Sequence, residues 1–228
     1  MKRGKLFVIA GNESSGKEKQ TKMLYNRLNS EGYKIEKSTF PRYETPTGKI
    51  IGGPLQGKPE ISESWFPEGA GNVPKEVASL YYLADRVYNM PPIKKTLENG
   101  LPVILDRYVE ANQMHQGGKI RDRKEREEFF QFIDTLEFGL YKLPRPDLTV
   151  VLHMPTEKAM ELKSKMTGVQ MDDLEKNFNY IKNSEESCLH FAEFYNLPLI
   201  SCVSKEGAIR HPKEIHEEVY SIIKDFLI

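Results

Sequence analysis

A short apolar run followed by a glycine-bounded polar loop is the feature that most constrains this chain. The run extends from Leu6 to Ala10, and the loop after it reads Gly11, Asn12, Glu13, Ser14, Ser15, Gly16 and Lys17. An unbroken apolar run of this length suits a strand that is buried on both faces of a parallel sheet. Two glycines separated by four residues, with a lysine directly after the second, are typical of a loop whose backbone N–H groups surround phosphate oxygens at a helix N-terminus. We therefore expect a strand, a phosphate-binding loop and a helix, in that order.

This loop predicts a nucleoside triphosphate site. Lys17 would reach the β- and γ-phosphates of ATP, and we expect the whole stretch from Gly11 to Lys19 to contact ATP. The motif asks for Ser or Thr directly after the lysine, because that hydroxyl binds Mg²⁺, but this chain has Glu18 followed by Lys19. A carboxylate is a competent Mg²⁺ ligand, so Glu18 could bind the ion directly, hold a water of its shell, or point away. We predict a Mg²⁺ site formed by Glu18 and by Asp106, which ends a later apolar run.

Strand and helix patterns alternate along the rest of the chain. After the first strand and a helix over 16–31, the pattern predicts strands over 34–40, 101–105, 147–153 and 197–203, and helices over 74–90, 122–140, 156–165, 172–195 and 212–227, with short helices near 49–56 and before Asn99. Such alternation implies a parallel sheet with helices on both faces. We predict an α/β fold of the P-loop NTPase type, with five parallel strands and a helical lid. The chain would form a single domain over 1–228, with the lid at about 161–176.

Charge, cysteine content and apolar segments exclude several other classes. The 228 residues carry 33 Lys and Arg against 33 Asp and Glu, so no basic field is available for a nucleic-acid partner. Cys188 and Cys202 are too few for a disulfide framework and too far apart for a zinc site. The run from Leu6 to Ala10 is shorter than the ~7–15 residues of a secretory segment or the ~20 of a membrane span. We expect a soluble cytoplasmic protein with no membrane partner.

Three further segments fall where a phosphate acceptor would bind, near the carboxyl ends of the strands. They are Phe40-Pro41-Arg42-Tyr43, the helical stretch from Leu80 to Arg86, and Asp106-Arg107-Tyr108 with the following Asn112-Gln113-Met114-His115-Gln116-Gly117-Gly118. Together with the phosphate loop and the Leu143-Pro144-Arg145-Pro146-Asp147 stretch, these motifs make the chain resemble thymidylate kinases over nearly its whole length. The form is most similar to bacterial or archaeal members.

The resemblance implies roles for individual residues. Arg42 and Arg107 would fork onto the phosphate of dTMP, because a planar guanidinium suits bidentate phosphate binding. Tyr82 would stack on thymine and Arg86 would donate to a thymine carbonyl. The remaining substrate-binding residues implied are Glu13 at the sugar hydroxyl, Asn112 and Gln116 in the base or sugar pocket, and Phe40 and Tyr108. Each has a plainer alternative: a surface ion pair, a core aromatic, a helix-capping group or a solvent-facing helix position. Ala111 stands where the family often has Ser.

The resemblance also implies a lid and a donor side. The phosphate loop carries no arginine, and the lid segment offers Lys163 and Lys165 but no arginine; we predict these two lysines to be catalytic together with Lys17 and Arg107. Lysine is a point charge, so it neutralises a phosphoryl group with less geometric control than arginine. Ser204 and Lys205 would lie beside adenine. The implied activity is Mg²⁺-dependent transfer of the γ-phosphoryl group of ATP to dTMP, by a homodimer. A weakly active or non-catalytic nucleotide-binding paralogue, and a kinase of the same fold with another acceptor, remain alternatives.

Overall fold

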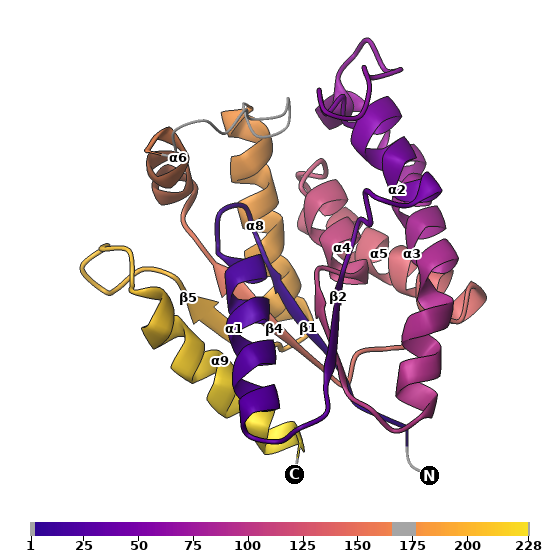
Figure 1. Ribbon diagram of the computed structural model, residues 1–228. Coiled ribbons are helices and arrows are strands. Elements are labelled where there is room, and N and C mark those ends of the chain that lie inside the picture. The colour runs from indigo at the N-terminus through magenta and orange to yellow at the C-terminus, as the bar shows by residue number, and fades with distance from the viewer. Residues whose placement is uncertain (1–2, 166–176, 228) are drawn as a thin grey trace.

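One parallel sheet forms the centre of the molecule. The structure is a computed structural model that describes residues 3–165 and 177–227 (Figure 1). Within these residues the strand order is β2-β3-β1-β4-β5, and every pair is parallel. The strands are β1 (Leu6–Gly11), β2 (Glu36–Thr39), β3 (Val103–Asp106), β4 (Leu148–His153) and β5 (Leu199–Ser201). The predicted fold class is confirmed, although β2 and β5 are shorter than the sequence pattern suggested.

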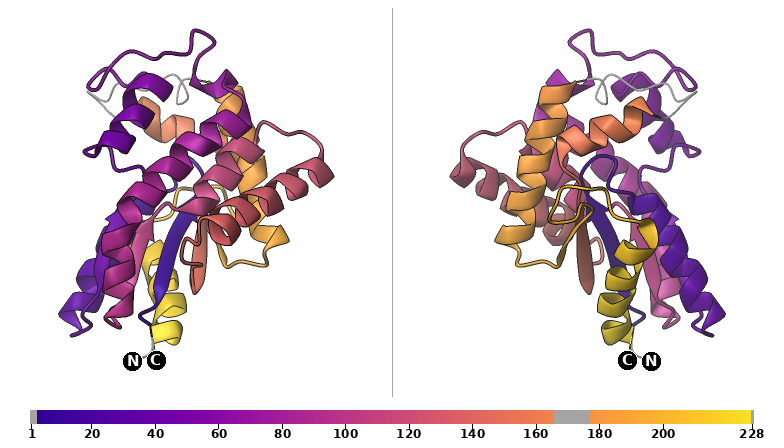
Figure 2. Two further views of the ribbon diagram at one scale, coloured as in Figure 1. Left: turned by 90° about the vertical axis from the view of Figure 1, so that its right-hand side faces the viewer. Right: turned by 90° about the vertical axis from the view of Figure 1, so that its left-hand side faces the viewer.

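Helices cover both faces of the sheet, which explains why β1 is apolar throughout. Leu6, Val8 and Ala10 point into one core, which also contains residues of α3 (Lys75–Glu98), α4 (Val109–Gly117), α5 (Arg123–Asp134) and α8 (Phe178–Phe194). Phe7 and Ile9 point into the other core, against α1 (Lys17–Ser30) and α9 (Pro212–Leu227). Figure 2 shows the two helical layers edge-on, with both chain ends at the amino end of the strands. The opposite, carboxyl end of the sheet is therefore left for the site.

Helix α3 differs from the prediction. The sequence suggested a helix over 74–90 and a separate short helix before Asn99, because Pro91 and Pro92 each remove a backbone donor. The structure has one helix from Lys75 to Glu98 that continues through both prolines, which are exposed. Ile93 and Leu97 continue the buried face of this helix against the sheet. Packing of that face outweighs the loss of two hydrogen bonds.

Two predicted helices contain π-helical turns, and one helix of the structure was not predicted. The expected short helix near 49–56 consists of α2 (Pro46–Ile50) followed by the π-helix η1 (Ile51–Leu55), and the same insertion contains the 3₁₀ turn η2 (Ala70–Asn72). A second π-helix, η3 (Thr135–Leu140), ends the helix predicted over 122–140. Helix α4 was not assigned from the sequence. The lid expectation is described only through α6 (Thr156–Ser164) and Lys165, since 166–176 lie outside the described residues.

No helix among the described residues is long and apolar enough to cross a membrane.

Candidate active site

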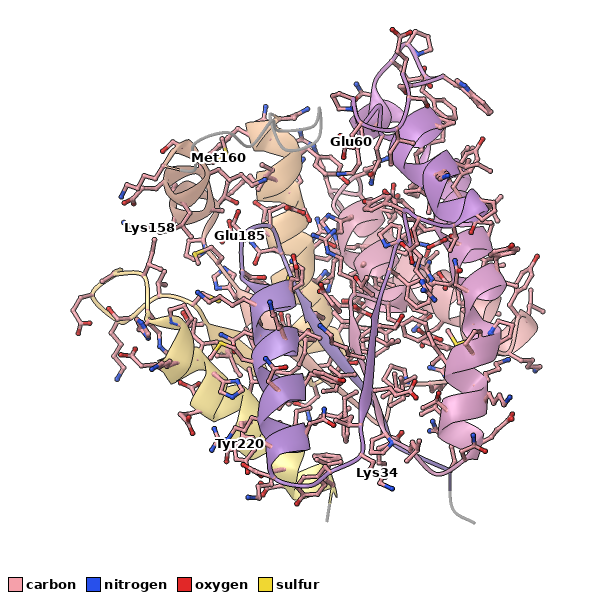
Figure 3. The ribbon with its side chains drawn as sticks, viewed as in Figure 1. Lys34, Glu60, Lys158, Met160, Glu185 and Tyr220 are labelled. Carbon is pink, nitrogen blue, oxygen red and sulfur yellow. The ribbon has the colours of Figure 1, made fainter. Side chains whose placement is uncertain are left out.

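A cavity of about 760 Å³ opens at the carboxyl end of the sheet. Its walls come from the phosphate loop, the ends of β2 and β3, one face of α3, and parts of α4 and α8. In Figure 3, Glu60 of the insertion and Met160 of α6 lie on either side of this end of the sheet. The volume is in the range that holds a nucleotide-sized ligand. The sequence-predicted residues that line it are Glu13, Ser14, Gly16, Lys17, Glu18, Phe40, Arg42, Tyr82, Arg86, Asp106, Arg107, Tyr108 and Asn112.

The phosphate loop is held in place from both sides. The Asn12 side chain donates to the Met154 carbonyl oxygen at 2.6 Å and accepts from the Met154 N–H at 2.9 Å, so the loop is tied to the end of β4. Gly11 has a φ of 148°, and a Cβ there would lie 2.3 Å from the Leu152 carbonyl oxygen. Only glycine fits this close approach. These contacts hold the loop in its curled form.

Lys17 is buried at the base of this loop. Its Nζ donates to the Asn12 carbonyl oxygen at 2.6 Å. Burial lowers the pKa of Lys17 to about 8, and the nearby Arg107 adds to this effect, while Glu13 and Asp106 oppose it. A buried ammonium group with a lowered pKa binds a phosphate strongly, because the negative charge of the phosphate compensates for the hydration that burial has removed.

Glu13 lies where two cations, Arg107 and Lys163, and the His115 imidazole meet from three parts of the chain. Its carboxylate lies 3.9 Å from Arg107, 3.8 Å from the His115 Nε2 and 3.7 Å from the Lys163 Nζ. Burial opposes ionisation, but Arg107, Lys17 and the other cations hold the pKa of Glu13 well below its usual range. Glu13 therefore stays ionised. It links the phosphate loop, the end of β3 and α6.

His115 belongs to this cluster, although sequence reasoning did not assign it a role. Its Nδ1 lies 3.0 Å from the Ser184 Oγ, and its ring is parallel to that of Tyr180, with both aromatic rings lining the cavity. Burial lowers the pKa of His115 to about 4, so the imidazole is neutral at pH 7. The helical spacing could have found it, because His115 lies one turn after Ala111 and Asn112 on α4.

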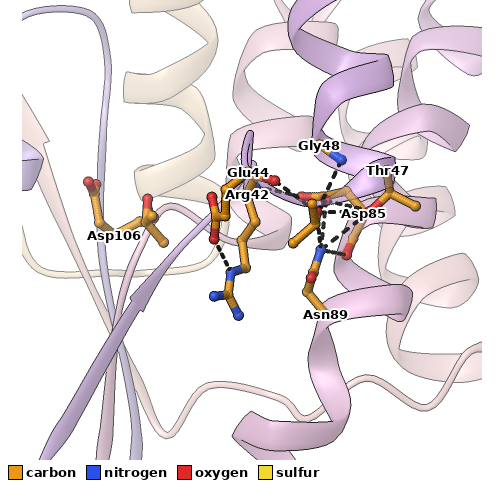
Figure 4. A network of polar contacts seen from close by, with 9 residues as sticks. Arg42, Glu44, Thr47, Gly48, Asp85, Asn89 and Asp106 are labelled. Atoms are coloured by element: carbon orange, nitrogen blue, oxygen red, sulfur yellow. Dashed lines mark hydrogen bonds and ion pairs between the residues drawn. The ribbon is translucent and has the colours of Figure 1, made fainter.

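A buried aspartate shapes the acceptor turn that follows β2 (Figure 4). Asp85 on α3 accepts from the Arg42 backbone N–H at 3.0 Å, from the Thr47 hydroxyl at 2.8 Å and from the Asn89 amide at 2.7 Å. The Arg42 guanidinium lies in the cavity wall and donates to Glu44 at 2.9 Å. The turn that presents Arg42 is thus fixed by α3, while its side chain rests on an exposed carboxylate at the rim.

Helix α3 and the insertion before it carry Tyr82, which is predicted to recognise the base, together with a hydrogen-bonded partner. The Tyr82 hydroxyl accepts from the Gln56 Nε2 at 2.8 Å, and the Gln56 Oε1 accepts from the Tyr43 hydroxyl at 3.1 Å. All three residues line the cavity. Gln56 follows the π-helix η1, and sequence reasoning did not single it out. This bridge fixes the plane of the Tyr82 ring.

Several predicted site residues have other surroundings. Tyr108 is fully buried, and its hydroxyl donates to the Pro144 carbonyl oxygen, so its polar group leads away from the cavity. Gln116 does not line the cavity, because it lies a further turn along α4, where its side chain is buried. Lys165 pairs with Glu161 on its own helix at 2.7 Å, whereas Lys163 reaches Glu13. The two lid lysines are therefore not equivalent.

The predicted donor residues after β5 lie beside the phosphate loop but outside the cavity. Ser204 and Lys205 belong to a turn closed by a hydrogen bond from the Gly207 N–H to the Ser204 carbonyl oxygen at 2.9 Å. The Cys202 thiol just before them donates to the Ser15 carbonyl oxygen at 3.4 Å. Lys19 is exposed and does not line the cavity, because α1 turns it away. Adenine contacts by Ser204 and Lys205 stay a prediction.

The site has oxygen atoms that suit a magnesium ion. Asp106 and Thr21 each have a buried oxygen without a hydrogen-bond partner, and both residues line the cavity with Glu18. Burial raises the pKa of Asp106, and the carboxylate of Glu18 adds to this effect. Nearby negative groups with unused oxygens fit a hard cation. No cluster of three His, Cys, Asp or Glu side chains is present in the described part of the chain. Proteins commonly bind Mg²⁺ through one or two carboxylates together with substrate phosphates.

The fold and the cavity define a P-loop kinase, with residues of the phosphate loop and two arginines, Arg42 and Arg107, lining the same cavity. Residues 9–207 match the family model described as thymidylate kinase. The chain is 30% identical to the thymidylate kinase of Halothermothrix orenii over 99% of both chains, and 28% identical to the human thymidylate kinase over 67% of this chain and 62% of that one. A solved thymidylate kinase structure from Candida albicans has the same fold, with a TM-score of 0.71 at 22% identity, covering 98% of this chain and 92% of that one. The chain belongs to the thymidylate kinase family.

Proposed function

We propose that this chain transfers the γ-phosphoryl group of ATP to dTMP and releases dTDP and ADP. A phosphate oxygen of dTMP attacks the γ-phosphorus, and the bond from that phosphorus to the β–γ bridging oxygen breaks. No covalent enzyme intermediate is needed. The observation that carries the proposal is that Lys17, Arg42 and Arg107 line one cavity, on the donor and acceptor sides of a single opening. Family membership supports the same conclusion, and it does not favour a non-catalytic paralogue.

Catalysis by this site would depend on positioning and on charge neutralisation. Lys17 and the curled loop hold the triphosphate, and Arg42 and Arg107 hold the acceptor phosphate. Arg42 would leave Glu44, which is an exposed partner and therefore a weak one. Lys163 would approach the transferred group, which its contact with Glu13 supports, and Lys165 would have to leave Glu161 to do the same.

Glu18 and Asp106 would hold Mg²⁺ together with the phosphates of ATP. The ion would neutralise charge on the β- and γ-phosphates. Both side chains line the cavity, and the unpartnered oxygen of Asp106 gives the ion a ready ligand. A Glu18→Ser variant restores the hydroxyl that the motif usually has. A rise in turnover would show that Glu18 weakens the site, and an unchanged or lower turnover would count against that hypothesis.

The chain would act as a homodimer in the cytoplasm. Val77, Leu80, Ala84 and Tyr88 lie at successive turns of α3 and are all exposed, with Leu80 at 53% and Tyr88 at 57%. A continuous apolar stripe on a helix is typical of a protein interface. The opposite face of the same helix carries Tyr82, Asp85 and Arg86, which line the cavity, so pairing through α3 would hold these residues in position. Cys188 and Cys202 are free thiols, as suits a reducing compartment.

A coupled assay of ADP release tests the activity. The purified chain is incubated with ATP, Mg²⁺ and each of dTMP, dUMP, dCMP, dGMP and AMP, and we expect turnover to be fastest with dTMP. Lys17→Met should abolish turnover, because the buried cation of the phosphate loop is lost. Lys22→Met is the matched control, since Lys22 is an exposed lysine on the same helix outside the cavity. Turnover of dTMP no higher than background, with ATP still bound, would contradict the proposal.

A further inference from the structure

A buried carboxylate outside the predicted site organises the base end of the cavity. Glu137 lies in the π-helix η3 and is 0% exposed. An ionisable residue is rarely buried so completely unless it is paired. π-helical turns are rare and occur frequently at functional sites. No motif in the sequence marks this residue.

Glu137 binds two of the residues that we expect at the base. Its Oε2 accepts from the Arg86 Nε at 2.6 Å, and its Oε1 accepts from the Arg86 Nη2 at 2.5 Å. The same Oε1 accepts from the Asn112 Nδ2 at 3.1 Å. Arg86 and Asn112 come from different helices, α3 and α4, and both line the cavity. One carboxylate therefore sets the orientation of two cavity residues.

These contacts determine which polar atoms the cavity wall offers. The bidentate pair fixes the guanidinium plane of Arg86, so its remaining N–H groups have a defined direction. The Asn112 Nδ2 is used by Glu137 and by the Ser79 carbonyl oxygen at 3.2 Å, and the Asn112 Oδ1 is buried without a hydrogen-bond partner. The Arg86 Nη1 also donates to the Tyr108 carbonyl oxygen at 3.3 Å, which leaves one N–H on each terminal nitrogen of Arg86 as a donor. The wall thus pairs a donor, Arg86, with an acceptor, the Asn112 oxygen.

We propose that Glu137 is a positioning residue that gives the base pocket this donor–acceptor polarity and so selects thymine over cytosine. Thymine presents an acceptor at O4 next to a donor at N3–H, whereas cytosine presents a donor at its amino group next to an acceptor at N3. A buried ion pair is costly to form, and its best-supported role is to specify one arrangement. The inference depends on the proposed dTMP kinase activity, because it names the residue that sets the base preference of that site.

The test compares dTMP and dCMP with Glu137→Gln, which keeps the shape of the side chain and removes its charge. We expect the KM for dTMP to rise about tenfold and the preference for dTMP over dCMP in kcat/KM to fall at least about tenfold, with the KM for ATP within about twofold. A purely structural role would lower Tm without changing the preference. A folded Glu137→Gln variant with an unchanged dTMP to dCMP ratio would overturn the proposal.

Two further variants keep the test decisive. Glu137→Asp retains the charge, and so spares folding, but withdraws the carboxylate by one methylene. We expect an intermediate loss of the preference for dTMP over dCMP. An unchanged preference would overturn the proposal even if Glu137→Gln does not fold. Asp147→Asn is the matched control. Asp147 accepts from the Leu6 N–H at 2.8 Å at the opposite end of the sheet, so its loss should lower Tm only. A wild-type chain inactive on dTMP would refute the proposed function rather than this inference.

Discussion

Raising the pH above 8 should weaken ATP binding through a single buried group, Lys17. Burial and the nearby Arg107 lower the pKa of Lys17 from its usual 10.5 to about 8 in the substrate-free protein. About nine-tenths of the Lys17 side chains are then neutral at pH 9. A bound triphosphate needs the ammonium form, so binding above pH 8 must take up a proton from solvent.

The magnitude follows from the size of that pKa shift. While the ATP-bound form stays protonated, the apparent Kd for ATP rises about tenfold for each pH unit above 8, or about 1.4 kcal/mol per unit. The effect on folding has the opposite sign. Because the pKa of Lys17 is lower in the folded chain than in the unfolded chain, the unfolded chain binds the proton more tightly. The contribution of Lys17 to the free energy of unfolding therefore increases between pH 8 and pH 10.5.

Isothermal titration calorimetry with ATP at pH 7.5, 8.5 and 9.5, in two buffers of different ionisation enthalpy, measures both the Kd and the proton uptake. We expect uptake to rise from about a quarter of a proton at pH 7.5 to nearly one at pH 9.5. Lys17→Arg should remove the uptake, because a guanidinium stays charged over this range. Lys22→Met should behave as the wild type. A Kd that is flat from pH 7.5 to 9.5, with no proton uptake, would refute the argument.

Three substitutions test other parts of the site. Tyr82→Phe removes the hydrogen bond from Gln56 and should raise the KM for dTMP about 2- to 10-fold in steady-state assays. Tyr81→Phe, at a residue outside the cavity, should leave that KM unchanged, and equal effects of the two variants would count against a role of the Gln56–Tyr82 hydrogen bond. Leu80→Glu places a charge in the exposed apolar stripe of α3 and should convert a dimer into a monomer. Light scattering after gel filtration measures the mass, and an unchanged mass would place the interface elsewhere. Glu18→Gln should raise the Mg²⁺ concentration for half-maximal turnover about tenfold, and no change would mean that Glu18 points away from the ion.

The phosphate loop was predictable because its chemistry is contained in a short stretch of sequence. Seven consecutive residues set its spacing, and the strand and helix on either side follow from the same stretch. The position of Arg107 was predictable for a similar reason. Arg107 directly follows a strand whose apolar pattern is clear, and the carboxyl ends of parallel strands meet at one edge of the sheet. The structure brings these residues into one cavity as expected.

The contributions of Gln56 and Glu137 could not be found in the same way. Gln56 follows a π-helical turn, whose hydrogen-bond pattern leaves no clear periodicity in sequence. Glu137 meets Arg86 across 51 positions of the chain, and that partnership exists only because α3 and η3 are packed together. The continuation of α3 through Pro91 and Pro92 is a related case, since local preference opposed it and packing prevailed.

The sequence by itself determined the α/β class, the phosphate loop with its unusual Glu18, and the arginines at the strand ends. These features depend on local spacing and on apolar periodicity. Only the tertiary structure decided that the Tyr108 hydroxyl points away from the cavity and that Gln116 lies outside it. The same is true of the contact of Lys163 rather than Lys165 with Glu13, and of the buried carboxylate that orients Arg86 and Asn112. The physical reason is that a buried polar group must find its partners in three dimensions, and those partners come from distant parts of the chain.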